Sequence, residues 1–159
     1  MSKNKYHYTE SGLDNIYLLD GFTNHKTPYG EGVSIQNTAA LHKAIGKHLI
    51  ARPIPLNGAE LRFLRTEMEL TQRDLAGIIG ATEQTLRLWE KNRGKFVPGT
   101  ADRLLRALYS EFAGGDVQIR KMLERLADLD RLENGPTCFK KSNSSWKPLQ
   151  GPQLDLMQA

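Results

Sequence analysis

Four side chains near the middle of the chain carry groups that can contact nucleic-acid bases. They are Glu83, Gln84, Arg87 and Leu88, within the stretch TEQTLRLWE. Glutamine suits a bidentate contact to adenine, glutamate accepts a hydrogen bond from cytosine, and leucine packs on the methyl group of thymine. Arg87 can reach a guanine or a phosphate. If these side chains share one exposed face, the sequence predicts a surface that contacts DNA.

Two short helices have to position such a face. Thr71 is expected to cap the first helix, with Asp74 as the acidic partner of a capping box, and Gly80 to end it. Thr82 is expected to cap the second helix, whose inward side carries Leu86 and Trp89. A turn of about four residues at the glycine lets the second helix cross the first steeply, as in a helix-turn-helix. The outward N-terminal turn then stays free for the major groove.

Apolar residues recur at helical spacing over most of residues 59–112. The helix before the two short ones has an apolar face, and a helix at 100–112 follows the loop RGKFVPGT. A further amphipathic helix is expected at 117–133. The positions expected to face inward are Leu61, Leu64, Met68, Leu75, Ile78, Ile79, Leu104, Leu105 and Leu108.

The N-terminal region differs from residues 59–112 in its pattern of apolar and turn-forming residues. Aromatic and β-branched pieces are broken by SG, DG and PYGEG turns, which predicts short strands. A helix capped by Asn37 or Thr38 follows, and the prolines of RPIPLNG end it. This proline-rich stretch is the predicted domain boundary.

The fold class predicted is mainly α. Residues 1–57 are expected to form a small α+β domain that binds a second copy or a partner, and residues 58–113 a five-helix domain that binds DNA. Residues 114–134 are assigned to an amphipathic C-terminal helix. Residues 135–159, rich in Pro, Gly, Ser and Asn, are assigned to a flexible tail.

Charge and composition narrow the class of protein. The chain of 159 residues has a net charge of +4 and contains 39% hydrophobic and 25% charged residues, typical of a soluble globular protein. Residues 84–106 hold six basic residues against Glu90 and Asp102, the charge pattern of a phosphate binder or of an ordinary solvated face. The sequence lacks a membrane-spanning apolar run of about 18 residues. One cysteine, Cys138, suits a reducing cytoplasm.

The stretch LRTEMELTQRDLAGIIGATEQTLRLWEKNRGKFVPGTADRLLRALY resembles the Xre-like, Cro/repressor-type helix-turn-helix family. The matching points are Leu70-Thr71-Gln72, Leu75-Ala76, Gly80, Thr82 and Trp89-Glu90. The resemblance implies a base-reading helix with Glu83, Gln84, Arg87 and Leu88. The expected phosphate contacts are Gln72, Thr82, Thr85, Arg93 and Lys95, with Gln72 also bracing Gln84. It also implies a structural ion pair between Arg65 and Glu90, and a glycine where this chain has Asn92, a residue that tolerates the left-handed conformation.

Residues 6–50 resemble the N-terminal region of YgiT/MqsA-type antitoxin-like regulators, in which a small zinc finger precedes an Xre-like domain. Relatives tend to have cysteine where this chain has Ser11, and their paired C-x-x-C motifs are missing here. A structural zinc site needs four ligands, usually cysteine or histidine. We therefore expect a zinc-free remnant held by its own apolar core, with no metal and no cofactor.

Enzymatic signatures are not expected from this sequence. GEG at 30–32 lacks the third glycine of a dinucleotide fingerprint, and a phosphate-loop motif is missing. Cys138 has no identifiable base in the polar tail. The sequence therefore predicts a binding protein rather than an enzyme.

The function predicted is that of a transcriptional regulator that reads double-stranded DNA with the helix at 82–91 as a homodimer on a palindrome. The dimer surface is expected on the helix at 117–133 or on residues 1–57, and the same helix can instead pack on its own domain. An antitoxin that neutralises a toxin through residues 1–57 and autoregulates its operon is the main alternative. A coactivator that does not read bases is a third.

Overall fold

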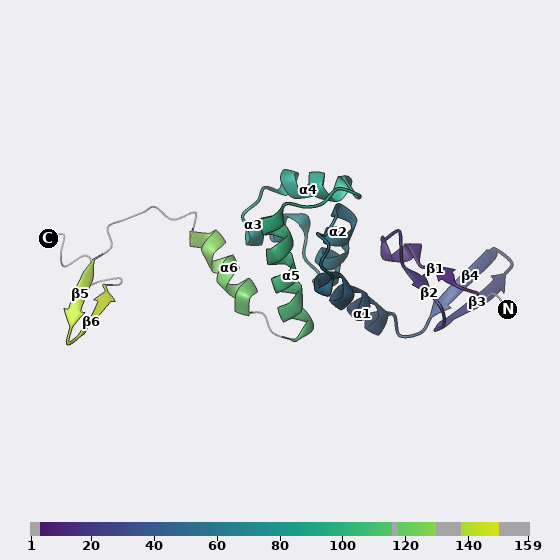
Figure 1. The fold of residues 1–159 in the computed structure, drawn as a ribbon, viewed down its shortest axis with the longest axis horizontal. Coiled ribbons are helices and arrows are strands. Elements are labelled where there is room, and N and C mark those ends of the chain that lie inside the picture. Colours follow the sequence, from purple (N-terminus) through teal and green to yellow (C-terminus); the bar gives the residue numbers. More distant parts are fainter. Residues whose placement is uncertain (1–3, 116–117, 130–137, 150–159) are drawn as a thin grey trace. The chain divides into compact units, whose positions relative to one another are not determined.

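Local hydrogen-bonding signals set where the elements begin and end. A computed structural model of the chain describes residues 4–115, 118–129 and 138–149, and it divides into two compact units, Met1–Ala127 and Asp128–Ala159. Each unit is described by itself. Within the described ranges there are six α-helices and three two-stranded antiparallel sheets, so the fold is mainly α with small β elements (Figure 1).

The helices are α1 Thr38–Ala51, α2 Gly58–Glu67, α3 Gln72–Ile79, α4 Glu83–Lys91, α5 Gly99–Ala113 and α6 Gln118–Leu129. The strands are β1 Tyr6–His7, β2 Tyr17–Leu18, β3 Phe22–Thr27, β4 Gly30–Ile35, β5 Phe139–Ser142 and β6 Ser145–Pro148. A 3₁₀ turn, η1, covers Thr9–Ser11. Strands pair in the order β1 with β2, β3 with β4 and β5 with β6.

The predicted caps of α3 and α4 are confirmed. The Thr71 hydroxyl accepts a hydrogen bond from the Asp74 amide at 3.0 Å, and the Asp74 carboxylate accepts one from the Thr71 amide at 3.3 Å. Gly80 ends α3 at φ 76°, a left-handed conformation that glycine adopts without steric cost. Thr82 caps α4 by accepting from the Thr85 amide at 3.1 Å. The connection between the two helices is therefore fixed by adjacent residues.

Replacing Thr71 by alanine is expected to lower the free energy of unfolding by about 1 kcal/mol, because the first turn of α3 loses its side-chain acceptor. Hydrogen bonds from the Thr71 hydroxyl and amide hold the pKa of Asp74 below its ordinary value. A carboxylate with a lowered pKa stabilises the fold above its ordinary pKa, and this contribution is lost as pH falls through the lowered value. In the variant, NMR titration should find the Asp74 pKa closer to its ordinary value.

Thr100 provides the matched control for this substitution. It is exposed in the first turn of α5, where no side chain caps the helix. Thr100→Ala should change the stability by less than about 0.5 kcal/mol. Equal losses for the two variants would contradict the role given to the cap.

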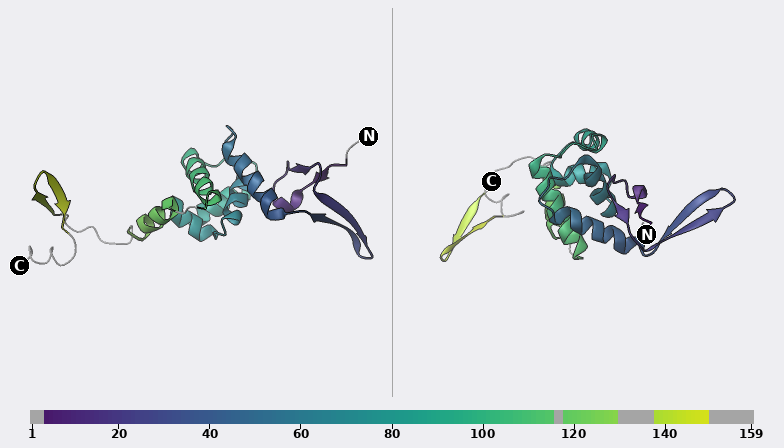
Figure 2. Two further views of the ribbon diagram at one scale, coloured as in Figure 1. Left: turned by 90° about the horizontal axis from the view of Figure 1, so that it is seen from below. Right: turned by 45° about the vertical axis from the view of Figure 1, so that its right-hand side comes forward.

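The helices share one apolar core. α1 packs against α5 and α2, and α4 packs against α2 and α3 (Figure 2). The largest fully buried side chains are Leu56, Leu61, Leu64, Leu75, Leu86, Leu105 and Tyr109. α1 approaches α5 closely, since a Cβ at Gly46 would lie 2.1 Å from the Tyr109 hydroxyl oxygen. The structure thus keeps residues 1–127 in one unit, whereas the sequence predicts a division at residue 57.

The reason for this difference lies in the stretch between α1 and α2. The Val97 amide donates to the Leu56 carbonyl at 2.9 Å, and Asn57 pairs with Phe96 in an isolated bridge. Arg106 of α5 donates to the carbonyls of Ile50 and Arg52 at 3.0 and 2.7 Å. The prolines end α1 as predicted, but the main chain around them is bound to the loop before α5 and to α5 itself.

The N-terminal segment, residues 4–18, is joined to this core. Tyr8, Leu13 and Leu18 are buried in the core cluster. The Tyr8 hydroxyl lies 2.6 Å from His42 Nε2, and His42 Nδ1 lies 2.7 Å from a Glu67 carboxylate oxygen. A carboxylate only accepts, so Nδ1 donates to Glu67. Burial raises the pKa of the Tyr8 hydroxyl above its ordinary value.

Within residues 135–159, which the sequence assigns to a flexible tail, residues 139–148 form the β5–β6 hairpin. Phe139 pairs with Pro148, and Asn143 makes the turn at φ 55°. The Leu149 amide donates to the Cys138 carbonyl at 2.8 Å and closes the base. Asparagine tolerates the left-handed region better than most residues, so the polar NS step is a hairpin turn.

Of the amphipathic helix predicted at 117–133, α6 covers Gln118–Leu129, and residues 117 and 130–133 lie outside the described residues. The Glu111 carboxylate accepts from the Ile119 amide at 2.9 Å. Ile119 and Leu123 pack against the core. This part of the helix therefore covers its own unit. None of the described helices has the length and apolar character needed to cross a membrane.

Candidate nucleic-acid interface

The four residues predicted to read bases lie together on the exposed side of α4. Glu83, Gln84, Arg87 and Leu88 are spaced i, i+1, i+4 and i+5, which places them on one helical face. All four are exposed, and the Leu88 side chain is half exposed although it is apolar. Figure 1 shows α4 at one edge of the helical unit, running across the direction of α2 and α5. The structure thus brings the predicted set together.

The opposite side of α4 is fixed to the core. Leu86 is fully buried, Glu90 is 6% exposed and Trp89 packs partly buried against the core. Gly58 at the start of α2 lies against the last turn of α4, because a Cβ at this position would be 2.0 Å from the Trp89 carbonyl oxygen. Only glycine fits such a backbone contact. α4 is therefore held along its length with its polar face outward.

The predicted ion pair between Arg65 and Glu90 is present. Arg65 Nε donates to Glu90 Oε1 at 2.7 Å, and Arg65 Nη1 donates to the Leu70 carbonyl at 2.8 Å. Gln72 Nε2 donates to the other carboxylate oxygen of Glu90. The bracing partner of Gln72 in the structure is thus Glu90, not the predicted Gln84. The network ties α2, the start of α3 and the end of α4 together.

The first turn of α4 lies at an exposed helix N-terminus. Thr82 is exposed, and its hydroxyl donates to the Thr85 hydroxyl at 2.8 Å, while Thr85 is partly buried. The positive end of the helix dipole and the free amides of a helix N-terminus favour an anion. Both threonines predicted to contact phosphate therefore lie where a phosphate is stabilised.

Glu83 and Arg87 form an exposed pair along the helix, with 3.0 Å between Oε1 and Nη2. Their side chains are 46% and 62% exposed. Such surface pairs contribute about 0–1 kcal/mol, so either side chain can exchange its partner at little cost. The pair therefore orders these two side chains on the exposed face of α4 and leaves each of them able to contact another molecule.

The end of α4 departs from the conformation that the resemblance implies. Asn92 caps the helix at φ −85° and ψ 67°, outside the left-handed region, and its amide donates to the Leu88 carbonyl at 3.1 Å. The Lys95 amide then donates to the Asn92 carbonyl at 3.0 Å. This loop geometry does not require glycine, which explains why asparagine is accommodated.

Within residues 84–106, the acidic side chains are buried and most of the basic side chains are exposed. Glu90 and Asp102, the two acids, are 6% and 8% exposed and pair with Arg65 and Arg106. Arg106 is one of the six basic residues of this stretch, but it donates to Asp102 and to main-chain carbonyls and does not face solvent. The exposed charges of the stretch are all basic: Arg87, Lys91, Arg93, Lys95 and Arg103.

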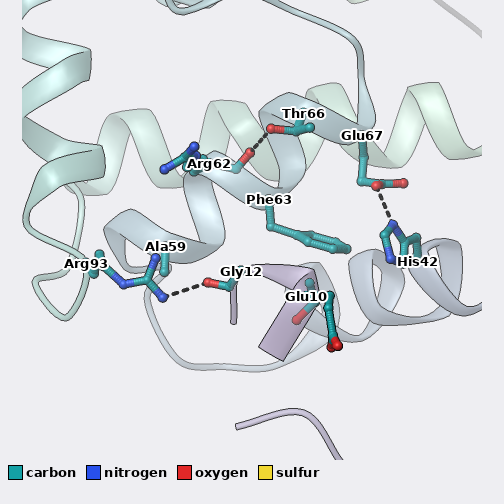
Figure 3. A pocket seen from close by; sticks show the side chains of 10 residues that line it. Glu10, Gly12, His42, Ala59, Arg62, Phe63, Thr66, Glu67 and Arg93 are labelled. Carbon is teal, nitrogen blue, oxygen red and sulfur yellow. Dashed lines mark hydrogen bonds and ion pairs between the residues drawn. The ribbon is translucent and has the colours of Figure 1, made fainter. Parts of the chain in front are cut away.

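Arg93 and Lys95 have different surroundings, although both are predicted phosphate contacts. Arg93 Nη2 donates to the Gly12 carbonyl at 2.7 Å (Figure 3). It also donates to Asp14 Oδ1 at 3.0 Å. The Lys95 side chain is exposed, and the structure gives it no acidic partner among the described residues. Lys95 is therefore exposed without an acidic partner among the described residues, whereas Arg93 is bound to the N-terminal segment.

A hollow of about 340 Å³ lies beside this contact, between η1 and α2 (Figure 3). Its charged lining is of mixed sign: Glu10, Glu67, Arg62 and Arg93. Glu67 binds His42 and Arg93 binds Gly12. The hollow therefore has no surplus of one charge that would select a charged ligand.

His7 and His25, like His42, are hydrogen-bonded within the chain. His7 Nε2 lies 2.7 Å from the Asp14 carbonyl and His25 Nε2 lies 2.8 Å from the Ser34 hydroxyl. Among the described residues, three or more His, Cys, Asp or Glu side chains do not gather as a metal site. Cys138 is a free thiol, partly exposed at the base of the β5–β6 hairpin.

Comparison with protein-family models, with curated proteins and with solved structures gives no match to this chain. The geometry of α3, α4 and the loop that follows is therefore the basis for assigning a function.

Proposed function

We propose that this chain is a sequence-specific double-stranded DNA-binding regulator of transcription, whose α4 enters the major groove. The observation that carries the proposal is the exposed face of α4, where Glu83, Gln84, Arg87 and Leu88 stand together opposite a fully buried side. A helix fits the major groove, where each base pair presents a distinct pattern of donors, acceptors and methyl groups. A purely structural helix hairpin explains the buried leucines but not this face.

Phosphate contacts would orient α4 on the duplex. Thr82 and Thr85 at the first turn and Lys95 in the following loop surround the base-reading residues in sequence. Phosphate contacts fix register and orientation, while base contacts carry sequence information. The exposed cations Lys91 and Arg103 add to the sequence-independent attraction.

A homodimer on a palindrome is part of this proposal. One α4 presents only four base-reading side chains, and helix-turn-helix proteins combine two such helices about 34 Å apart on half-sites one turn apart. Residues 1–57 are the surface that could join the copies, because Ile119 and Leu123 of α6 pack against the core of their own unit.

Selection of binding sites from a random duplex library tests the proposal. A palindromic winner, bound about 10³-fold or more tighter than a scrambled duplex, is the expected result. Binding without any enriched sequence would contradict the proposal and would indicate only non-specific electrostatic binding by a basic surface.

Gln84→Ala is expected to cost about 1–3 kcal/mol on the selected site and to relax one base position, because a bidentate contact is lost. Lys95→Ala, its matched comparison, should weaken all duplexes alike and reduce the salt slope by about 1. Fluorescence anisotropy on the selected and scrambled duplexes across salt concentrations measures both effects. Equal losses on both duplexes for Gln84→Ala would remove Gln84 from base readout.

An antitoxin that neutralises a toxin is the second candidate, favoured by the β3–β4 hairpin. This hairpin has no third strand among the described residues, and Tyr29 at its tip is fully exposed. Free strand edges accept a strand from another protein. Growth arrest by a small neighbouring gene product, relieved when this chain is co-expressed, would support the antitoxin, and relief that survives Gln84→Ala would separate it from DNA binding.

A further inference from the structure

The β5–β6 hairpin carries three lysines and no acidic residue. Lys140, Lys141 and Lys147 are exposed, and residues 138–149 contain neither aspartate nor glutamate. No ion pair within the described residues involves these lysines. The hairpin is therefore a small element with a charge of +3.

The pairing register places two of these charges directly opposite each other. Lys140 pairs with Lys147 across the strands, and Lys141 pairs with Trp146. Side chains alternate between the faces, so Lys140 and Lys147 share one face and Lys141 and Trp146 the other. Like charges directly opposite each other in a sheet are destabilising, since their Cβ atoms lie about 4.5–5.5 Å apart. An anion between the two ammonium groups removes this repulsion.

The hairpin also leaves its aromatic side chains uncovered. Phe139 and Trp146 are 57% and 65% exposed, and every residue of both strands is exposed. An isolated two-stranded hairpin is marginally stable in water, so contact with a partner stabilises it. The partner has to supply closely spaced negative charge on one side and tolerate flat apolar groups on the other.

We propose that the β5–β6 hairpin is a second DNA contact, which binds the phosphate backbone of the same duplex that α4 reads; this inference rests on the proposed function. A duplex carries one negative charge per about 1.7 Å of its axis, which suits two ammonium groups on one face of a hairpin. Because α4 and the hairpin belong to one chain, binding of α4 raises the effective concentration of the hairpin at the DNA. The hairpin adds affinity without sequence preference, since phosphates carry no sequence information.

The test replaces all three lysines by glutamine in the full chain, Lys140→Gln, Lys141→Gln and Lys147→Gln. Affinities for the selected and scrambled duplexes are measured from about 50 to 200 mM salt. Each lost phosphate contact lowers the slope of log affinity against log salt by about 0.9, so the slope should fall by about 2 to 3. The ratio of selected to scrambled affinity should stay the same.

A second triple variant controls for net charge. Lys26→Gln, Lys43→Gln and Lys47→Gln remove the same charge from exposed positions on β3 and α1. This variant should change the salt slope far less than the hairpin variant. Equal changes in slope would overturn the hairpin contact, because only total charge would then matter.

Trp146 gives a direct readout of the contact. Its emission, obtained as the difference between the wild-type chain and Trp146→Phe, should change when duplex is added to the wild type and not when it is added to the lysine variant. An unchanged slope and unchanged emission would overturn the proposal. So would binding to vesicles of anionic lipid that depends on the three lysines while DNA binding does not.

The outcomes separate this inference from the proposed function. If Gln84→Ala lowers the selectivity and the lysine variant keeps the wild-type slope, α4 reads DNA and the hairpin does not bind it. If no sequence is enriched and the lysine variant still lowers the slope, the hairpin binds phosphate and the proposed base readout fails. Absence of any DNA binding would overturn both.

Discussion

Replacing Glu90 by alanine is expected to lower the free energy of unfolding by about 3–5 kcal/mol, because it leaves a buried arginine without its counter-charge. The Arg65 and Glu90 side chains are only 14% and 4% exposed, and Gln72 loses its acceptor as well. Arg65 retains the Leu70 carbonyl, which satisfies one of its donors. The loss should be visible in chemical denaturation.

Two further variants test the explanation for this loss. Glu83→Ala removes the carboxylate of an exposed pair on the same helix and should change the stability by less than about 0.5 kcal/mol. The double variant Arg65→Met with Glu90→Leu should recover most of the loss, because apolar residues of similar volume can replace a buried pair. If Glu90→Ala costs no more than Glu83→Ala, the pair does not stabilise the fold.

Gly58→Ala is expected to lower the stability by about 1–3 kcal/mol, because the added methyl group overpacks a contact between two main chains. Its Cβ would lie 2.0 Å from the Trp89 carbonyl oxygen and 2.8 Å from that of Asn92. Neither atom belongs to a side chain that can rotate away. The last turn of α4 and the following loop must shift, so affinity for the selected duplex should fall more than affinity for a scrambled one.

Gly77 provides the matched control for Gly58. It lies inside α3, exposed, with open space where a Cβ would be and without a left-handed φ. Gly77→Ala should stabilise the protein by about 0.4–1 kcal/mol through the unfolded chain. Thermal unfolding and duplex binding, measured for both variants, test these two expectations. A Gly58→Ala variant as stable as wild type would contradict the close contact between α2 and α4.

The segment from α3 to α4 could be predicted from sequence because its signals are local. Thr71 and Thr82 bond to amides three residues away, and Gly80 takes its left-handed conformation within one turn. The exposed face of α4 follows from helical spacing once Leu86 is buried. No long-range information is needed for any of these.

Contacts between residues far apart in the chain could not be predicted in this way. Asp102 accepts from the Leu56 amide at 2.8 Å across 46 positions, and Arg106 reaches carbonyls more than 50 positions away. Periodicity places both on α5 but does not say what they meet. From the sequence, Arg106 is therefore predicted to be a surface charge, and the stretch before α2 is predicted to be a boundary between domains.

The hairpin at 139–148 was not predicted because of the amino-acid composition of the stretch around it. Serine, asparagine and proline dominate the stretch around it, and such a composition usually marks a loop. One asparagine at φ 55° turns the chain back on itself, so that Lys141 and Trp146 pair across the strands. A two-residue step between Ser142 and Ser145 was the signal that could have indicated it.

The bond from Arg93 to Gly12 and Asp14 makes the loop after α4 and the N-terminal segment thermodynamically coupled. DNA that draws Arg93 to a phosphate has to break this bond, and a ligand that pulls residues 12–14 away releases the arginine. Linkage makes the two effects equal, so any factor by which such a ligand changes DNA affinity is the factor by which DNA changes the affinity for the ligand. If α4 reads DNA as proposed, a ligand bound at residues 12–14 would therefore change the affinity for DNA through Arg93.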